Sequence, residues 1–135
     1  MTLLESCMSA AIIGAVTLIT VPALLKSRDD YALHTAAHDV ATKMNLARIH
    51  AVSRNRDCRL RVTSTVSYAV ECQEGSNWLL SDAIVVPRGV TIAANAKPEF
   101  HRLGNVSPTA TITLSNTAGR QKKVVVNNGG RIRID

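Results

Sequence analysis

The chain opens with a long apolar segment that ends abruptly. Between residues 1 and 25 the only charged side chain is Glu5, whereas residues 26–30 read Lys-Ser-Arg-Asp-Asp. A helix of about 23 residues rises roughly 35 Å, which is enough to cross the hydrocarbon core of a bilayer. A secretory signal peptide would carry positive charge before a shorter apolar run, and a chain of 135 residues has no core large enough to bury such a helix. Residues 1–25 are therefore predicted to form a transmembrane helix.

The apolar pattern becomes one-sided after residue 25. In residues 26–54 apolar side chains recur at alternating steps of four and three, the stripe of an amphipathic helix: Leu33, Ala37, Val40, Met44, Ala47 and Ala51. The opposite face holds Asp39, Lys43, Asn45 and Arg48. Because this segment contains no glycine or proline, one continuous helix of about 50 residues is expected from the N-terminus. Pro22 is the one breaker, and it should kink or loosen the preceding turn.

From residue 55 onward the pattern changes to short alternating segments, which are typical of strands. The candidate strands are residues 58–63, 67–72, 83–86, 90–93, 99–102, 110–115, 121–126 and 131–134. Turns are expected at Pro87-Arg88-Gly89, at residues 116–119 and at Asn127-Asn128-Gly129-Gly130, and residues 73–82 are expected to form a loop. The predicted fold class is α+β: a long N-terminal α-helix, transmembrane in its first half, packed through residues 26–54 on a small antiparallel β-sheet domain of residues 55–135.

Two cysteines bracket the first predicted hairpin. A three-residue turn at residues 64–66 would place Cys58 directly opposite Cys72. Opposed positions on paired antiparallel strands lie about 4.5–5.5 Å apart at Cα, a distance that a disulfide can bridge. A Cys58–Cys72 disulfide is therefore predicted, with two buried free thiols as the alternative. Cys7 lies within the apolar run and is interpreted as a small apolar residue.

The balance of charge limits the partners without identifying one. The chain has 16 basic and 10 acidic residues, which gives a net charge of +6 and favours anionic partners such as nucleic acid or lipid headgroups. Aromatic residues make up only 3%, too few for base stacking to be the main means of binding. His34 and His38 lie four residues apart without an evident third ligand, so a solvated helix face is expected there. The sequence contains no nucleophile elbow, metal motif or phosphate loop, and neither catalysis, a metal nor a cofactor is expected.

The last residues form a candidate binding site. Alternation places Arg131 and Arg133 on one face of a strand and Ile132 and Ile134 on the other. The two guanidinium groups would lie roughly 6.6 Å apart along the strand, a spacing at which they can grip neighbouring phosphates. The preceding Gly129-Gly130 would let a backbone approach closely. Three basic residues near the previous strand could extend the patch, although alternation puts the two lysines on opposite faces: Arg120, Lys122 and Lys123. The alternative is a solvated outer face whose arginines pair locally.

The first residues carry a resemblance to a known family. The opening Met1-Thr2-Leu3-Leu4-Glu5, followed by Ala11-Ile12-Ile13-Gly14 and by Pro22, resembles the mature N-terminus of type IV pilins and type II secretion pseudopilins. That family usually starts Phe-Thr-Leu-Ile-Glu, so Met1 is a departure, one that the family tolerates. The resemblance implies a chain processed by a prepilin peptidase and methylated at its new N-terminus. It also implies storage in the inner membrane before an assembly ATPase builds the chain, with copies of itself or other pilins, into an extracellular or periplasmic filament. Residues 55–135 would then be extracytoplasmic.

The same resemblance assigns assembly roles to four residues: Met1, Glu5, Gly14 and Pro22. A lone carboxylate in an apolar helix costs roughly 2.5–3.5 kcal/mol on insertion scales, so Glu5 should have a partner. In the family that partner is the α-amine of residue 1 of a neighbouring subunit, and the alternative is a side chain solvated at the membrane interface. In assembled pili the helix around Gly14 and Pro22 often extends, whereas a simple kink at Pro22 is the alternative.

Other segments resemble one branch of that family, the pseudopilin H and FimT group. They are Arg48 with Arg54-Asn55-Arg56, Leu80 with Pro87-Arg88-Gly89-Val90-Thr91-Ile92, residues 110–115 with Ala118-Gly119-Arg120, and Gly129-Gly130-Arg131-Ile132-Arg133-Ile134. A Gly-Arg-x-Arg ending of this kind binds DNA in the FimT branch. Three functions are therefore open: a mainly structural filament subunit, a minor pilin that binds DNA non-specifically, and a secretion pseudopilin that contacts cargo or other pseudopilins.

Overall fold

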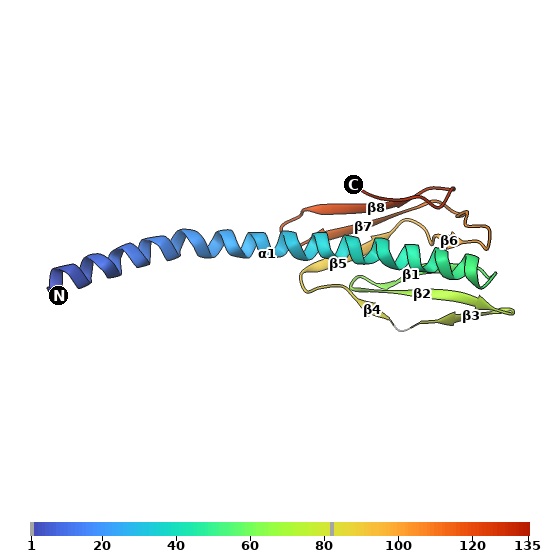
Figure 1. Cartoon of the computed structure of the whole chain (residues 1–135), viewed down its shortest axis with the longest axis horizontal. Coiled ribbons are helices and arrows are strands. Elements are labelled where there is room, and N and C mark those ends of the chain that lie inside the picture. Colours follow the sequence, from blue (N-terminus) through green and yellow to red (C-terminus); the bar gives the residue numbers. More distant parts are fainter. Residues whose placement is uncertain (1, 82) are drawn as a thin grey trace.

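The computed structural model describes residues 2–81 and 83–135, whose arrangement is shown in Figure 1. Within these residues the chain forms one helix, α1 (Leu3–Ser53), and the strands β1 (Cys58–Ser64), β2 (Ser67–Glu74), β3 (Asn77–Leu80), β4 (Ile84–Val85), β5 (Val90–Ala94), β6 (Glu99–Phe100), β7 (Ala110–Asn116), β8 (Gln121–Val126) and β9 (Ile132–Ile134). The first half of α1 projects away from the strands, and the second half lies along them (Figure 1). The predicted α+β class, a long helix packed on antiparallel strands, is confirmed.

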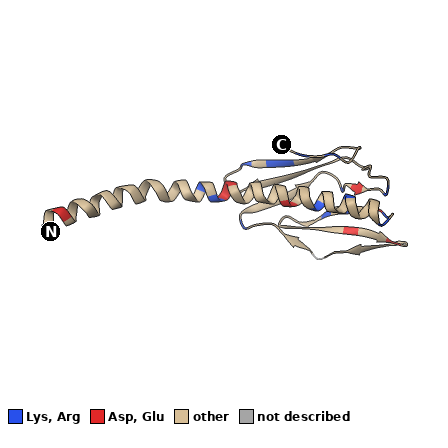
Figure 2. Cartoon of the chain, in the orientation of Figure 1, with Lys and Arg blue, Asp and Glu red and all other residues tan. Residues whose placement is uncertain are grey.

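α1 changes from fully exposed to amphipathic along its length. Every described residue from Thr2 to Arg28 is exposed, and Glu5 is the only charged side chain among them before Lys26 (Figure 2). The second half buries a stripe against the strands: Leu33, Ala36, Ala37, Val40, Met44, Ala47 and Ala51. This is the predicted stripe with Ala36 added, and its alanines let the helix axis lie close to the strands. After Ser53 the helix ends, and Asn55 takes a left-handed φ of 52°.

The second half of α1 packs against two antiparallel sheets rather than one. The first sheet has the strand order β3-β2-β1-β6, with β4 also paired to β2, and the second has the order β5-β7-β8-β9. Alternation is clearest in β7, where every second residue from Ala110 to Asn116 is buried. The largest fully buried side chains come from both sheets and from the helix: Tyr68, Phe100, Met44, Leu60, Ile112 and Leu114. One helix stripe therefore closes a core that both sheets share.

The loop predicted for residues 73–82 is wrong over most of its length. β2 continues to Glu74, and β3 pairs with it through a turn in which Gly75 has a φ of 63°. Leu79 and Leu80 in β3 remain more than half exposed, so the strand lacks the alternation of buried and exposed positions that reveals a strand in a sequence. Trp78 instead packs under the Arg59 guanidinium, 4.0 Å from its ring centroid. The strand predicted for residues 99–102 is also shorter than expected, since β6 ends at Phe100.

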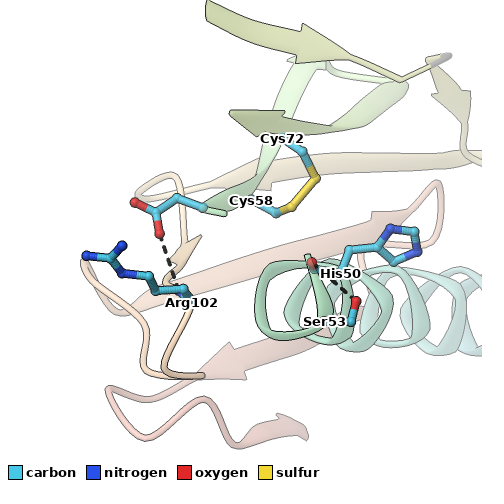
Figure 3. Close-up of a disulfide and its surroundings, with 6 residues drawn as sticks. His50, Ser53, Cys58, Cys72 and Arg102 are labelled. Atoms are coloured by element: carbon cyan, nitrogen blue, oxygen red, sulfur yellow. Dashed lines mark hydrogen bonds between the residues drawn. A yellow bond between two sulfur atoms is a disulfide. The ribbon is translucent and has the colours of Figure 1, made fainter. Parts of the chain in front are cut away.

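The β1–β2 hairpin has the predicted register. Cys58 lies opposite Cys72, and a disulfide joins them (Figure 3). The turn itself is tighter than predicted, because Ser64 pairs with Ser67 and an irregularity between Val62 and Ser64 takes up the extra residue. The disulfide therefore links β1 directly to β2 beside the C-terminal end of α1 (Figure 3).

Two buried polar side chains of β2 differ in how they are satisfied. Glu71 is 3% exposed, and its carboxylate accepts hydrogen bonds from Arg59 Nε at 2.5 Å and from Arg61 Nη1 at 3.2 Å. Burial alone would raise the pKa of Glu71, but the hydrogen bonds from Arg59 and Arg61 outweigh it and hold the pKa below its usual range. Tyr68 is buried too, and its hydroxyl has no hydrogen-bond partner within the described part of the chain. Burial, followed by the charge of Asp39, raises the pKa of Tyr68 to about 12.

Candidate functional site

The first half of α1 presents an apolar surface that nothing in the described chain covers. Its most apolar 18-residue window has a mean hydropathy of 2.1, so the helix is long and apolar enough to cross a membrane. Its hydroxyl groups are turned back onto the helix: Ser9 donates to the Glu5 carbonyl, Thr17 to that of Gly14 and Thr20 to that of Val16. These internal hydrogen bonds leave a mainly apolar cylinder for contact with lipid or with other helices.

Glu5 lies in the first turn of this cylinder. Its carboxylate accepts a long hydrogen bond of 3.5 Å from the backbone N–H of Thr2. A carboxylate at this end of a helix also interacts favourably with the helix dipole. Met1, which carries the α-amine that the resemblance pairs with Glu5, lies outside the described residues. Pairing with a neighbouring subunit therefore stays a prediction, and within one chain Glu5 has only this weak local contact among the described residues.

The two other residues assigned to assembly lie further along the same half. Gly14 is exposed, and a Cβ at this position would meet no atom within 4 Å. α1 runs through Pro22 without interruption. Proline has no N–H, so the Leu18 carbonyl lacks the donor that a regular helix would supply. The described chain thus combines an open position at Gly14 with a weakened turn before Pro22, and extension of this segment stays a prediction.

β9 begins at Ile132, one residue later than predicted, so Arg131 lies just before the strand; the arginines are nevertheless separated from the isoleucines as the alternation predicts. Ile132 and Ile134 are half-buried and pack against the core, whereas Arg131 and Arg133 are exposed. Arg133 lies opposite Val125 of β8, and the two arginines line a shallow hollow of about 190 Å³ with Val125 and Asn127. The two guanidinium groups therefore belong to one outward surface of the second sheet.

The other predicted basic residues divide between two faces. In β8 the buried positions are Val124 and Val126, so Lys123 lies on the outward face with Arg133, and Lys122 lies on the inward side. Arg120, in the turn before β8, forms an ion pair with Asp30 of α1. We call Lys123, Arg131 and Arg133 the terminal basic face. Lys122 and Arg120 are not part of it.

Part of the terminal basic face is paired locally. Arg133 Nε lies 2.8 Å from one carboxylate oxygen of Asp135, and its Nη2 donates to the other at 2.9 Å. The pair is largely solvent-exposed, with 65% of the Arg133 side chain accessible. An exposed pair of this kind contributes about 0–1 kcal/mol, so a phosphate can compete for the guanidinium. The face is thus open to an anion, at some expense to this ion pair.

Gly130 and Arg48 have surroundings that sequence reasoning missed. Gly130 is buried. The groups that come close to its backbone are the Gly104 carbonyl and the side chain of Arg48, both from within the chain. Arg48 was expected on the polar face of the helix, but it is half-buried and donates to carbonyl groups of two loops. No sequence motif reports such contacts, because backbone carbonyls are present at every residue.

A group of titratable side chains lies at the end of the domain near the disulfide. Asp57 accepts a hydrogen bond from the Arg102 backbone N–H at 3.3 Å, and its second oxygen lies 3.4 Å from His101 Nδ1. The carboxylate of Glu99 joins them within 4.8 Å. These contacts tie the loop after β6 to the start of β1. No sequence pattern indicated the group, since more than 40 residues separate Asp57 from Arg102.

Comparison with known proteins adds a family and a fold. Residues 36–130 match the family model of the type II transport protein GspH. The minor pseudopilin EpsH from the type 2 secretion system of Vibrio cholerae has a TM-score of 0.67 at 13% identity, with 76% of this chain and 95% of that chain covered. The type IV minor pilin FimU of Pseudomonas aeruginosa has a TM-score of 0.63 at 16% identity, with 79% and 90% covered. Likeness at such identities concerns the fold alone. No curated protein sequence matches significantly.

Proposed function

Because the chain belongs to the GspH family, we propose that it is a structural subunit of a pilus-like or pseudopilus filament, assembled from the inner membrane. The observation that carries this proposal is α1, whose first half exposes a mainly apolar surface while its second half holds the folded domain. Such a surface is stable only when lipid or other apolar helices cover it. In the membrane the cover is hydrocarbon, and in a filament it is the same half of neighbouring subunits.

Glu5 would fix the axial position of each subunit relative to its neighbours when other helices replace lipid around α1. In the membrane its carboxylate has only the weak contact with Thr2 among the described residues. A lone charge in hydrocarbon costs roughly 2.5–3.5 kcal/mol, and a cationic α-amine from a neighbouring subunit would offset part of that cost at one axial position. Prepilin peptidase would create this amine, and an assembly ATPase would drive the exchange into an extracellular or periplasmic filament. The subunit itself has no catalytic role in this proposal.

Glu5→Ala tests the filament proposal. The variant should insert in the membrane like the parent chain, because it removes a charge from an apolar helix, but it should enter filaments poorly. Glu74→Ala removes an exposed carboxylate from the end of β2 and should assemble normally. Membrane fractionation measures insertion, and immunoblots of isolated filaments measure assembly. Parental amounts of Glu5→Ala in filaments would contradict the role of Glu5, and absence of the parent chain from filaments would contradict the subunit proposal.

A second candidate function is non-specific DNA binding, supported by the shared outward direction of Lys123, Arg131 and Arg133. Arg131, just before β9, and Arg133 within it give two arginine forks on one side that match the spacing of a phosphate backbone, and Ile132 and Ile134 anchor the strand from its other side. Phosphate contacts release counterions, so affinity should fall steeply as salt rises. Because Asp135 competes for Arg133, Asp135→Asn should strengthen binding.

The test of DNA binding compares two pairs of cations. Replacing Arg131 and Arg133 together by glutamine should remove binding without unfolding the domain, and Arg→Lys at both positions should restore only part of it. The matched control replaces Lys43 and Arg88 by glutamine, which removes the same charge from other parts of the surface. Equal losses in the two double variants, measured by fluorescence anisotropy with a labelled duplex, would mean that the terminal basic face has no special part in binding.

A further inference from the structure

The side chain of Arg48 joins three parts of the molecule that are far apart in the sequence. Arg48 lies near the C-terminal end of α1, and its Nε donates to the Gly104 carbonyl at 3.2 Å. Its Nη1 donates to the Gly130 carbonyl at 3.2 Å, and its Nη2 donates to the Gly129 carbonyl at 3.4 Å. Gly104 lies between β6 and β7, and the other two glycines lie between β8 and β9. One planar guanidinium group thus holds two separate loops against the helix.

The two loops also contact each other at this point. Val106 N–H donates to the Asn128 carbonyl at 2.9 Å. Gly130 is buried with a φ of 78°, and a Cβ there would lie 2.4 Å from the Gly104 carbonyl oxygen and 2.9 Å from Arg48 Nε. Both the backbone conformation and the available space therefore require glycine. The turn before β9 is fixed relative to α1 and to the loop after β6.

The terminal basic face begins immediately after this fixed turn. Arg131 follows Gly130, and its backbone N–H donates to Asn127 Oδ1 at 2.9 Å. β9 has three residues, lies at the edge of its sheet and pairs with β8. A short edge strand is held on one side only and opens easily unless its ends are anchored. The direction of the Arg131 and Arg133 side chains therefore depends on how the turn is held.

We propose that Arg48 is a positioning residue for the terminal basic face. It anchors the turn between β8 and β9, and it thereby keeps Arg131 and Arg133 at the spacing that a phosphate backbone requires. The inference rests on the proposed DNA binding by this face. Three of the five N–H groups of Arg48 donate to the carbonyls of Gly104, Gly130 and Gly129, so its part in binding is to hold the turn and not to contact phosphate. Its positive charge matters less than its fork of donors.

The experiment uses the full-length chain in detergent micelles, as parent, Arg48→Gln, Arg48→Lys and the control Lys43→Gln. Hydrogen exchange of residues 104–106 and 127–135 reports the anchoring, exchange of β1 and β2 reports global folding, and anisotropy with a labelled duplex reports DNA binding. Both Arg48 variants should lose protection in the two loops and bind DNA roughly tenfold more weakly, as when about a tenth of the molecules hold the competent strand. Lysine should not rescue, because a single ammonium cannot span three carbonyls. Lys43→Gln should leave the protection unchanged.

Three results would overturn the inference. Unchanged protection of residues 127–135 in both Arg48 variants would show that Arg48 does not anchor the turn. Parental DNA affinity in Arg48→Lys, combined with weak binding in Arg48→Gln, would show that the charge acts directly and not through position. If the parent chain binds no DNA at all, the proposed binding function fails and its positioning role with it. The exchange data then still decide separately whether Arg48 anchors the turn.

Discussion

The two halves of α1 share one continuous helix but stand in opposite relations to the rest of the chain. The first half, up to Arg28, has no buried residue among those described, whereas the second half buries seven. The first half is apolar on all sides, and the second is apolar on one stripe only. A helix that is apolar on all sides needs a membrane or a bundle of other helices to cover it. An amphipathic helix needs only its own domain to cover its apolar stripe. The contacts that stabilise the domain therefore lie in the second half, and the apolar surface that is open to lipid or to other helices lies in the first half of the same element.

Substitution of one methionine in each half of α1 should give the largest difference in stability between the two halves. Met44 is fully buried in the second half, and Met8 is 62% exposed in the first. Met44→Ala should lower the unfolding free energy of the β domain by about 2–5 kcal/mol, because it leaves a cavity under both sheets. Met8→Ala should change it by less than about 0.5 kcal/mol. Denaturation followed by the fluorescence of the single tryptophan, Trp78, measures both. Similar losses would show that the two halves are not independent.

Paired glycines test the contact between the second half and the turn before β9. Gly130→Ala should destabilise the domain by about 1–3 kcal/mol, since the new methyl group collides with the Gly104 carbonyl and with Arg48. Gly129→Ala should be nearly neutral, because its Cβ would meet only Asn127 Oδ1 at 3.6 Å. Thermal unfolding of the two variants side by side gives the difference. A neutral Gly130→Ala would mean that the turn shifts without loss.

The next largest difference in stability is expected between substitutions of two carboxylates, Glu71 in the β domain and Glu5 in the first half of α1. Glu71→Gln should cost about 1–2 kcal/mol at neutral pH, because Arg59 and Arg61 lose a charged acceptor. The folded-state pKa of Glu71 is lowered from 4.5, so its contribution is complete above that value and disappears as the pH falls through the folded-state pKa. Unfolding curves between neutral and acidic pH should show this loss in the parent chain. Glu71→Gln should lack this part of the acid dependence, and Glu5→Gln in the first half should retain it.

Substitution of two tyrosines, Tyr68 and Tyr31, should give the smallest difference in stability, and here the buried substitution should stabilise the domain. Tyr68→Phe should stabilise the domain by about 1 kcal/mol, because it removes a buried hydroxyl that has no partner in the described chain. The folded-state pKa of Tyr68 is raised from 10.0 to about 12, so stability should fall as the pH rises through that window in the parent and less so in the variant. Tyr31→Phe, on the exposed side of α1, should be neutral. Destabilisation by Tyr68→Phe would reveal a hydrogen bond to the hydroxyl.

Periodic burial explains why much of the fold could be predicted. Val40 and Met44 recur at helical spacing because one face of α1 is buried, and Ile112 and Leu114 alternate because one face of β7 is buried. The same rule explains the error in β3, whose side chains are mostly exposed and carry no period. The hairpin register was predictable because a turn centred on residues 64–66 places Cys58 opposite Cys72. The division into two sheets was not, since it depends on contacts among distant strands.

The candidate site divides in the same way. Alternation along one strand was enough to place Arg131 and Arg133 together, because faces repeat every two residues. The surroundings of Gly130 required the fold, since the Arg48 side chain and the Gly130 carbonyl are 82 residues apart. In addition, a backbone carbonyl is present at every residue, so no residue type in the sequence marks the ones that Arg48 contacts. Sequence thus predicts which groups share a face, and only the tertiary structure identifies what holds that face in place.

The attachment of α1 to its domain also determines how the subunit responds to tension. Arg120 and Asp30 tie the sheets to one end of the packed half, and Arg48 ties them to the other. Between them the buried stripe from Leu33 to Ala51 extends over about 27 Å. A pull along the helix axis loads these contacts in shear, so they must slide together instead of peeling apart one by one. We expect the helix to yield first outside the packed half, in the turn before Pro22, where proline has already removed a hydrogen bond.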